Sequence, residues 1–139
     1  MYLGTSVVVK LYTNERDSGE CEALVVGNIL VSSSLLLCEF RSAMLRKISL
    51  GLISRDLGAE VWQAFNTDID ALKVNLIPMS DFLVRDAAEL MDHLFPKVPL
   101  RTLDALHLAT YLSVEAGPFF TKDARLCQAA MHLGVALAK

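Results

Sequence analysis

Residues 28–49, "NILVSSSLLLCEFRSAMLRKIS", join a short apolar segment to a longer amphipathic one. "NILVSS" is typical of a buried strand, and the apolar residues from Ser34 to about Ser49 recur at helical spacing. Ser32–Ser34 offer side-chain oxygens for a helix N-cap, and Gly51 suits the left-handed conformation that ends a helix. A strand that runs directly into a helix in this way predicts an α/β fold.

The same alternation continues on both sides of this unit. Strands separated by helical crossovers favour a mostly parallel sheet with helices on both faces, which makes three layers. The clearest irregular link is "FPKVPLRT" at 95–102. We predict one domain over residues 1–139 with a sheet of four to five strands. The expected strands are 1–4, 28–33, 72–79, 118–122 and 135–138, and the expected helices are 5–13, 18–27, 34–49, 54–70, 81–95, 102–115 and 124–133.

The composition agrees with one well-packed domain. The chain has 139 residues, of which 53% are hydrophobic, and its mean hydropathy is +0.41. A chain of this size buries a core without disulfide bonds. The high apolar content favours a sheet that is covered on both faces, and it makes an apolar interface between subunits plausible.

No segment resembles a membrane span. Ala23–Cys38 has the fewest charges, but it is shorter than the roughly 20 residues that a span needs. Polar or small residues also interrupt it, namely Gly27, Asn28 and Ser32–Ser34. We see no signal-peptide pattern after Met1 and expect a cytoplasmic protein.

The three cysteines, Cys21, Cys38 and Cys127, are widely spaced and include no CxxC pair. The sequence therefore predicts neither a disulfide framework nor a zinc site. A net charge of −3 argues against a surface that is basic throughout, although it leaves room for a local basic stripe.

Three acidic residues are candidates for a metal site. Glu39 lies in "LLLCEFRSAML" among apolar neighbours, Asp104 lies in the first turn of "RTLDALHLATYL", and Asp123 begins the helix in "FFTKDARL". Two of them are expected at junctions on the reactive edge of the sheet, where parallel strands end. The third is one turn into the helix that follows "NILVSS". Oxygen ligands that converge from separate segments are what Mg²⁺ or Mn²⁺ requires.

Each acidic residue also has a simpler interpretation. Glu39 can reach solvent at the edge of its helix. Asp104 suits the positive end of the helix dipole, and Asp123 is a favourable N-cap. From the residues alone, both interpretations stay open.

Other chemistries have weaker support. His107 lies three residues after Asp104 and can touch the same site, although a buried, hydrogen-bonded histidine is the commoner outcome. His93 and His132 have no second ligand at metal spacing. The chain lacks GxGxxG, GxxxxGK[ST], GxSxG and HExxH motifs, which removes the main support for nucleotide-loop, serine-hydrolase and zinc-peptidase functions.

Gly4 stands at the end of the first strand in "MYLGTSVVVK". A strand that ends at a reactive edge usually presents a side chain there, and this one presents none. The glycine either serves the backbone at a bulge or close approach, or it marks a vacated functional position.

The motifs together resemble the PIN-domain ribonucleases. "MYLGTSVVVKLY" is similar to the hydrophobic–Asp–Thr/Ser–Ser start of that family, and "SSLLLCEFRSAMLRK" is similar to its Glu helix. "RTLDALHLATYL" followed by "FFTKDARLCQAA" resembles its two later acidic motifs. The resemblance extends from residue 2 to about 136 and is strongest to the VapC-type toxins of toxin–antitoxin pairs.

This resemblance implies a Mg²⁺- or Mn²⁺-dependent endoribonuclease with a PIN-like fold. Glu39, Asp104 and Asp123 match its metal-binding cluster, and Ser6 and Thr121 match the hydroxyl residues beside that cluster. Gly4 replaces an Asp that is central to the metal site, so the resemblance implies that this chain is inactive or impaired. The substitution belongs to a degenerate homologue, was introduced to inactivate a toxin, or is compensated by a nearby side chain or water.

The resemblance also implies a homodimer, a cognate antitoxin and an RNA substrate. The antitoxin would be small and offer a basic segment to the acidic pocket. Basic residues near the motifs are candidates for RNA binding, namely Arg41, Arg46, Lys47 and Arg101. A solvated helix face explains the first three equally well.

Two other classes of protein stay open. The first is a non-catalytic PIN-like module that binds RNA or protein. The second is a receiver-like phosphoacceptor domain, which also places acidic residues, Thr and Lys at a sheet edge, as Thr121 and Lys122 do. A receiver needs a nucleophilic Asp at the end of a central strand, and the sequence has none there.

Overall fold

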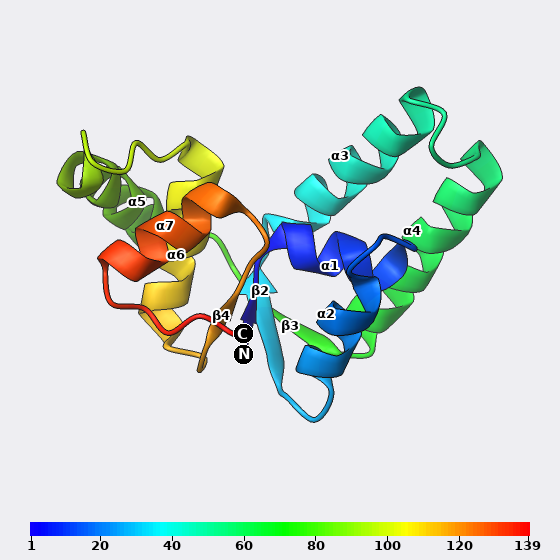
Figure 1. The fold of residues 1–139 in the computed structure, drawn as a ribbon, viewed down its shortest axis with the longest axis horizontal. Coiled ribbons are helices and arrows are strands. Elements are labelled where there is room, and N and C mark those ends of the chain that lie inside the picture. Colours follow the sequence, from blue (N-terminus) through cyan, green and yellow to red (C-terminus); the bar gives the residue numbers. More distant parts are fainter.

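Four short parallel strands form the centre of the computed structural model, which describes residues 1–139 (Figure 1). Their order across the sheet is β3-β2-β1-β4. Tyr2 pairs with Val31 on one side and with Phe119 on the other. The strands are β1 (Tyr2–Leu3), β2 (Leu30–Ser33), β3 (Val74–Ile77) and β4 (Phe119–Phe120).

Seven helices cover the two faces of this sheet. One face carries α5, α6 and α7, and the other carries α1 to α4 (Figure 1). They are α1 (Thr5–Tyr12), α2 (Ser18–Val25), α3 (Leu36–Ser49), α4 (Arg55–Asp70), α5 (Asp81–Leu94), α6 (Thr102–Val114) and α7 (Ala124–His132). This arrangement confirms the predicted α/β class, the parallel sheet and the three layers.

The sheet separates two hydrophobic cores. Successive side chains of a strand point to opposite faces, so even a strand of two residues contributes to both cores. Tyr2 and Phe119 pack in the core under α5 to α7, whereas Leu3 and Phe120 pack in the core under α1 to α4. All four side chains are almost completely buried, which anchors the centre of the sheet between the two helical layers.

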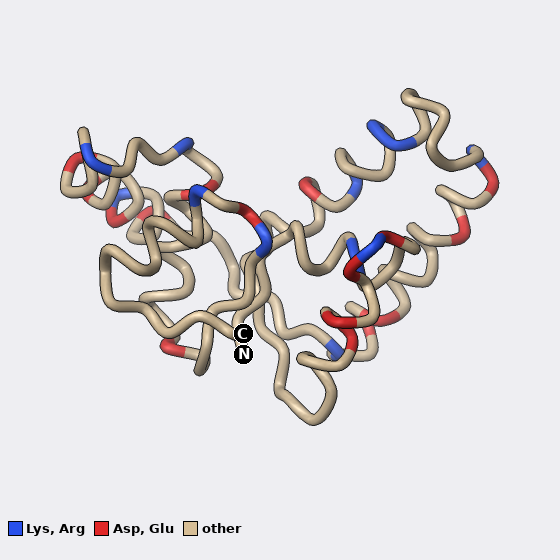
Figure 2. Tube along the Cα trace, in the orientation of Figure 1, with Lys and Arg blue, Asp and Glu red and all other residues tan.

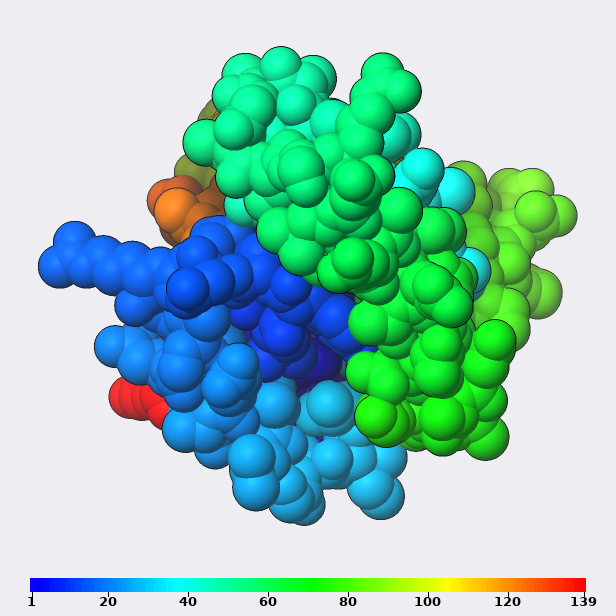
Figure 3. All heavy atoms as spheres, turned by 90° about the vertical axis from the view of Figure 1, so that its right-hand side faces the viewer, coloured from blue at the N-terminus to red at the C-terminus, as the bar shows by residue number.

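Figure 3 views the molecule from the side of the second face, which carries α1 to α4. In Figure 3 the first residues, in deep blue, lie in a hollow between the blue of α2 and the green of α4. α3 and α4 form an antiparallel pair that extends away from the sheet (Figure 1). None of the seven helices has both the length and the apolar character needed to cross a lipid bilayer.

Two expectations about helix and strand ends need correction. α3 starts at Leu36, and its N-cap residue, Leu35, makes no side-chain cap. Two serines of the expected cap bond elsewhere, because Ser32 Oγ donates to Leu3 O at 2.7 Å and Ser34 Oγ accepts from Met79 N at 3.1 Å. These two serines join β2 to its neighbours, and Ser33 Oγ accepts from the N–H of Leu35 at 3.3 Å, just before the helix. The expected last strand is reduced to one bridge between Phe119 and Leu137.

Candidate active site

Several candidate residues lie where the parallel strands end. α1 begins directly after β1 and Gly4, α3 follows β2, and α7 begins four residues after β4. Because all four strands run in the same direction, these junctions share one edge of the sheet. That edge holds the first turn of α1, which carries Thr5 and Ser6.

Glu39 points toward the first turn of α1. Thr5 Oγ1 donates to Glu39 Oε2 at 2.6 Å, and His107 Nε2 lies 2.5 Å from the same oxygen. No protein hydrogen bond reaches the other oxygen, Oε1. Burial acts to raise the pKa of the Glu39 carboxyl. The hydrogen bond and charge of His107, together with the hydrogen bond from Thr5, outweigh burial, so the pKa is lowered. The carboxylate is therefore stabilised in its ionised form.

His107 is buried, with 2% of its surface exposed, and it connects Glu39 to the centre of the sheet. Its Nδ1 lies 2.9 Å from the hydroxyl of Tyr2, and the two rings meet edge to face. Tyr2 is fully buried, and this burial raises the pKa of its hydroxyl. A line of hydrogen bonds thus runs from β1 through His107 to Glu39.

Ser6 and Thr121 form a second group of contacts at the edge. Their hydroxyl oxygens are 3.4 Å apart. The Lys122 backbone N–H donates to Ser6 Oγ at 3.0 Å, and the Asp123 N–H donates to Thr121 Oγ1 at 3.1 Å. Ser6 and Thr121 therefore bond the segment that leads to Asp123, and their role beside a metal cluster stays a prediction.

Asp104 and Asp123 are the second acidic group. Asp123 Oδ1 caps α7 by accepting from the N–H groups of Arg125 and Leu126 at 2.8 and 3.1 Å. Asp104 Oδ2 lies 3.9 Å from Arg125 Nε and accepts from the Arg101 N–H at 3.4 Å. Burial, and after it the negative charge of Asp123, raises the pKa of the Asp104 carboxyl. The two carboxylates therefore repel each other, and a nearby cation would relieve this repulsion.

Gly4 has an ordinary extended backbone, with φ −76° and ψ 152°, which any residue adopts. A Cβ added here would lie 3.0 Å from Thr121 Oγ1 and 3.1 Å from Thr121 Cβ. Backbone conformation does not require the glycine, but the Thr121 side chain would have to shift by a few tenths of an ångström to admit another residue. Both sequence-based interpretations of Gly4 are compatible with this geometry.

A family model described as "PIN domain" matches residues 1–131. The chain belongs to the PIN domain family. Ribonuclease VapC46 of Mycobacterium tuberculosis (strain ATCC 25618 / H37Rv) is 34% identical over 140 residues, which cover 99% of this chain and 95% of that protein. A solved toxin–antitoxin complex from Klebsiella pneumoniae shares 20% identity with a TM-score of 0.56, over 88% of this chain and 85% of the other, which supports the fold alone.

The acidic residues of this PIN domain fall into two groups. Glu39 is held by Thr5 and His107, whereas Asp104 and Asp123 are coupled to each other. No three His, Cys, Asp or Glu side chains are gathered so as to hold a metal ion. The donor chemistry of Asp104 and Asp123 fits a hard divalent cation, because each carboxylate has one oxygen outside the hydrogen bonds given above. A single site that includes Glu39 stays a prediction.

The candidate RNA-binding residues have different surroundings. Arg46 lines a surface cavity of about 450 Å³ that also contains Glu39, and the positive charge of Arg101 acts on Asp104. Arg41 lies over the Trp62 ring, 5.1 Å from its centroid. Figure 2 shows basic residues along α3, whereas α4 carries mainly acidic ones. Arg46 and Arg101 are therefore the two candidates beside acidic site residues.

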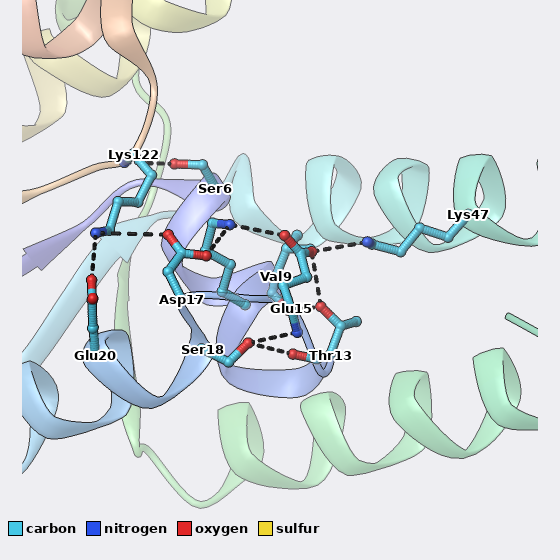
Figure 4. A network of polar contacts seen from close by, with 10 residues as sticks. Ser6, Val9, Thr13, Glu15, Asp17, Ser18, Glu20, Lys47 and Lys122 are labelled. Carbon is cyan, nitrogen blue, oxygen red and sulfur yellow. Dashed lines mark hydrogen bonds and ion pairs between the residues drawn. The ribbon is translucent and has the colours of Figure 1, made fainter. Parts of the chain in front are cut away.

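Lys47 belongs to a separate network of ion pairs (Figure 4). Its Nζ lies 2.9 Å from Glu15, which also binds Lys10 at 2.8 Å. Lys10 binds Asp17 at 2.6 Å, and Lys122 lies 3.7 Å from Asp17. The network links α1 and α3 to the segment before α7, and it occupies the charges of both Lys47 and Lys122. This pairing argues against the receiver-like alternative, which relies on Lys122.

Tyr2 and Thr5 contribute to the site, although local sequence pattern does not point to either. Tyr2 was expected only as a strand residue, and its bond to His107 joins residues 105 positions apart. The resemblance points to Ser6 and not to Thr5. A detectable signal exists for Thr5, because two consecutive hydroxyl residues in a first helical turn at the reactive edge both deserve consideration as site residues.

Proposed function

We propose that this PIN domain is a divalent-metal-dependent endoribonuclease, the toxin of a toxin–antitoxin pair, whose activity is impaired by Gly4. The family match and the similarity to a protein named as a VapC ribonuclease support this function. The observation that carries it is the pair Asp104 and Asp123, close enough for the charge of Asp123 to raise the pKa of Asp104, next to a segment whose backbone N–H groups bond the Ser6 and Thr121 hydroxyls. The proposal includes a cytoplasmic location.

The chain's own residues would divide the work of phosphodiester hydrolysis. Asp104 and Asp123 would hold a Mg²⁺ or Mn²⁺ ion, with Glu39 contributing through its free Oε1. When bound, such an ion polarises the phosphate and lowers the pKa of a bound water. The hydroxyls of Ser6 and Thr121 would orient the substrate or ordered waters. Arg46 and Arg101 would attract the phosphate backbone.

The missing carboxylate at position 4 is the proposed cause of the impaired activity. Removing one carboxylate removes a ligand and part of the negative charge that attracts the cation. A Gly4→Asp variant is expected to bind Mn²⁺ more tightly than the parent chain and to cleave RNA faster. Gly4→Ala is the matched control, because it adds the same Cβ against Thr121 without a carboxylate.

The experiment compares Mn²⁺ binding by calorimetry and RNA cleavage for the parent, Gly4→Asp and Gly4→Ala. The proposed function predicts a gain for the aspartate variant alone. Equal binding and cleavage in all three proteins would show that Gly4 is a structural glycine and that the site has been misassigned.

With this function, the chain would form a homodimer and bind a small antitoxin. The cavity beside Glu39 would accept a segment of the antitoxin, and a basic residue of that segment would pair with the carboxylates. Its lining is Thr5, Leu35, Cys38, Glu39, Ser42, Ala43, Arg46 and Leu103. Light scattering that shows only monomer at high concentration would contradict the dimer.

A second candidate function is a non-catalytic module that binds RNA or protein on the same scaffold. It is favoured by the separation of Glu39 from the two aspartates, since no three acidic or histidine side chains are gathered for a metal. Gly4→Asp would decide between the two functions. If that variant binds Mn²⁺ but cleaves no RNA, the binding module is the better assignment.

A further inference from the structure

Two donors converge on one oxygen of Glu39 and leave the other free. Thr5 Oγ1 donates to Oε2 at 2.6 Å, and His107 Nε2 lies 2.5 Å from it. Thr5 and His107 also lie close to each other, with 3.3 Å between Oγ1 and Nε2. Because the glutamate side chain has three rotatable bonds, contacts of this kind determine where Oε1 points.

The direction of these hydrogen bonds follows from the chemistry of the groups. An ionised carboxylate only accepts, so His107 must carry a proton on Nε2. Thr5 also donates its single hydroxyl proton to Oε2. The tyrosine hydroxyl can donate to Nδ1 of a neutral ring or accept from a protonated one, and in both cases Nε2–H faces Glu39.

The imidazole ring itself is held rigidly. It is 2% exposed, and the Tyr2 hydroxyl engages Nδ1 at 2.9 Å from the opposite side. Tyr2 is fully buried in β1, where it pairs with both neighbouring strands. The ring is therefore attached to a buried central strand, while the Glu39 side chain is 21% exposed.

We propose that His107 is a positioning residue, which fixes the carboxylate of Glu39 through Nε2–H so that Oε1 faces the site. This inference deepens the proposed function and rests on it. Residues that hydrogen-bond to a ligating side chain orient it, and their loss typically lowers metal affinity by about 10- to 100-fold. His107 contributes in this way without touching substrate or metal.

The test measures Mn²⁺ affinity by calorimetry in the full chain. His107→Leu removes the donor and is expected to weaken binding by about tenfold or more. His107→Gln places an amide N–H near the position of Nε2 and is expected to recover most of the affinity. His93→Leu, a change at an exposed histidine of α5, is the control and should bind as the parent does. Circular dichroism checks the fold of each variant.

A second measurement does not depend on metal. In protein labelled with ¹⁵N-histidine, NMR should show a slowly exchanging proton on Nε2 of His107. Its resonance should move in Glu39→Gln and stay in place in Asp104→Asn. If His107→Leu fails to fold, this signal and the affinity of His107→Gln decide the proposal.

The outcomes separate this inference from the proposed function. A folded His107→Leu that binds Mn²⁺ like the parent overturns the positioning role, as does an Nε2 without a proton. A second outcome is that His107→Leu binds Mn²⁺ more weakly while even Gly4→Asp cleaves no RNA. That result supports the positioning role of His107 and rejects the nuclease function. If neither the parent nor Gly4→Asp binds Mn²⁺, the proposed function and the positioning role in metal binding both fail.

Discussion

The Thr121 side chain fills the space beside Gly4, so that a Cβ added to Gly4 would stand 3.0 Å from Thr121 Oγ1 and 3.1 Å from Thr121 Cβ. This contact joins the end of β1 to the segment that follows β4. It also limits what a substitution at position 4 can do, because any new side chain enters the space that Thr121 fills.

We expect Gly4→Ala to lower the free energy of unfolding by about 0.5–1 kcal/mol, because Thr121 has to move. Gly4→Asp should recover a few tenths of this, since Gly4 is the N-cap of α1 and a carboxylate can accept from the free N–H groups there. Urea unfolding without divalent ions measures both. A loss of more than about 3 kcal/mol in Gly4→Asp would show that the site cannot admit a carboxylate.

Asp104→Asn is expected to stabilise the protein in the absence of metal, by up to about 1 kcal/mol. Burial and Asp123 raise the pKa of Asp104, so the folded state disfavours its ionised form at neutral pH. Thermal unfolding with a chelator present checks this. The stabilising effect should disappear at acid pH, where the parent's Asp104 is protonated, and a destabilised variant at neutral pH would contradict the repulsion.

Acid should weaken the fold through Glu15. Hydrogen bonds from Lys10 and Lys47 lower the pKa of Glu15 to about 2, below its ordinary value of 4.5. A depressed pKa stabilises the folded state above pH 4.5, and this contribution is lost as the pH falls from 4.5 toward 2.

The Glu15→Gln variant isolates that contribution. We expect it to be less stable than the parent at pH 7, by about 1 kcal/mol for a partly exposed group, and to approach the parent near pH 2. Thermal unfolding across this pH range is the measurement. Curves that differ by the same amount at every pH would rule out the ionic origin.

RNA binding should depend on Arg46 more than on Arg41 or Lys47. Arg46 shares a cavity with Glu39, whereas Arg41 stacks on Trp62 and Lys47 pairs with Glu15. We expect Arg46→Ala to weaken binding of single-stranded RNA and to reduce the slope of log K against log salt by about 1. Fluorescence anisotropy without divalent ions measures this, with Arg41→Ala as the matched control. Equal losses in the two variants would indicate a diffuse basic surface.

The elements of the fold follow from local pattern, whereas the contacts of the site do not. The helix near 81–95 was predictable because Leu83, Ala87 and Leu94 recur on one face, and all three are buried. The prediction that Ser32 and Ser34 cap α3 is wrong, because neighbouring segments of the chain compete for their hydroxyls. Tertiary partners, which a single sequence does not reveal, decided that competition.

The acidic residues illustrate the same limit. The N-cap role of Asp123 was readable from its place before a helix, and the structure contains it. The hydrogen bond between His107 and Glu39 was not predictable from the sequence, because it joins residues 68 positions apart. Local sequence identifies which side chains reach the edge of the sheet, but the distances between them depend on how the helices pack.

Thr5 and Ser6 are consecutive residues of α1, yet they face different groups. Side chains one residue apart on a helix point about 100° away from each other. Thr5 therefore reaches Glu39 and His107, while Ser6 reaches Thr121 and the backbone of Lys122. One peptide unit of α1 therefore contacts both the residues around Glu39 and the segment that leads to Asp123, so substitutions at Thr5 and at Ser6 are expected to disturb different halves of the same sheet edge.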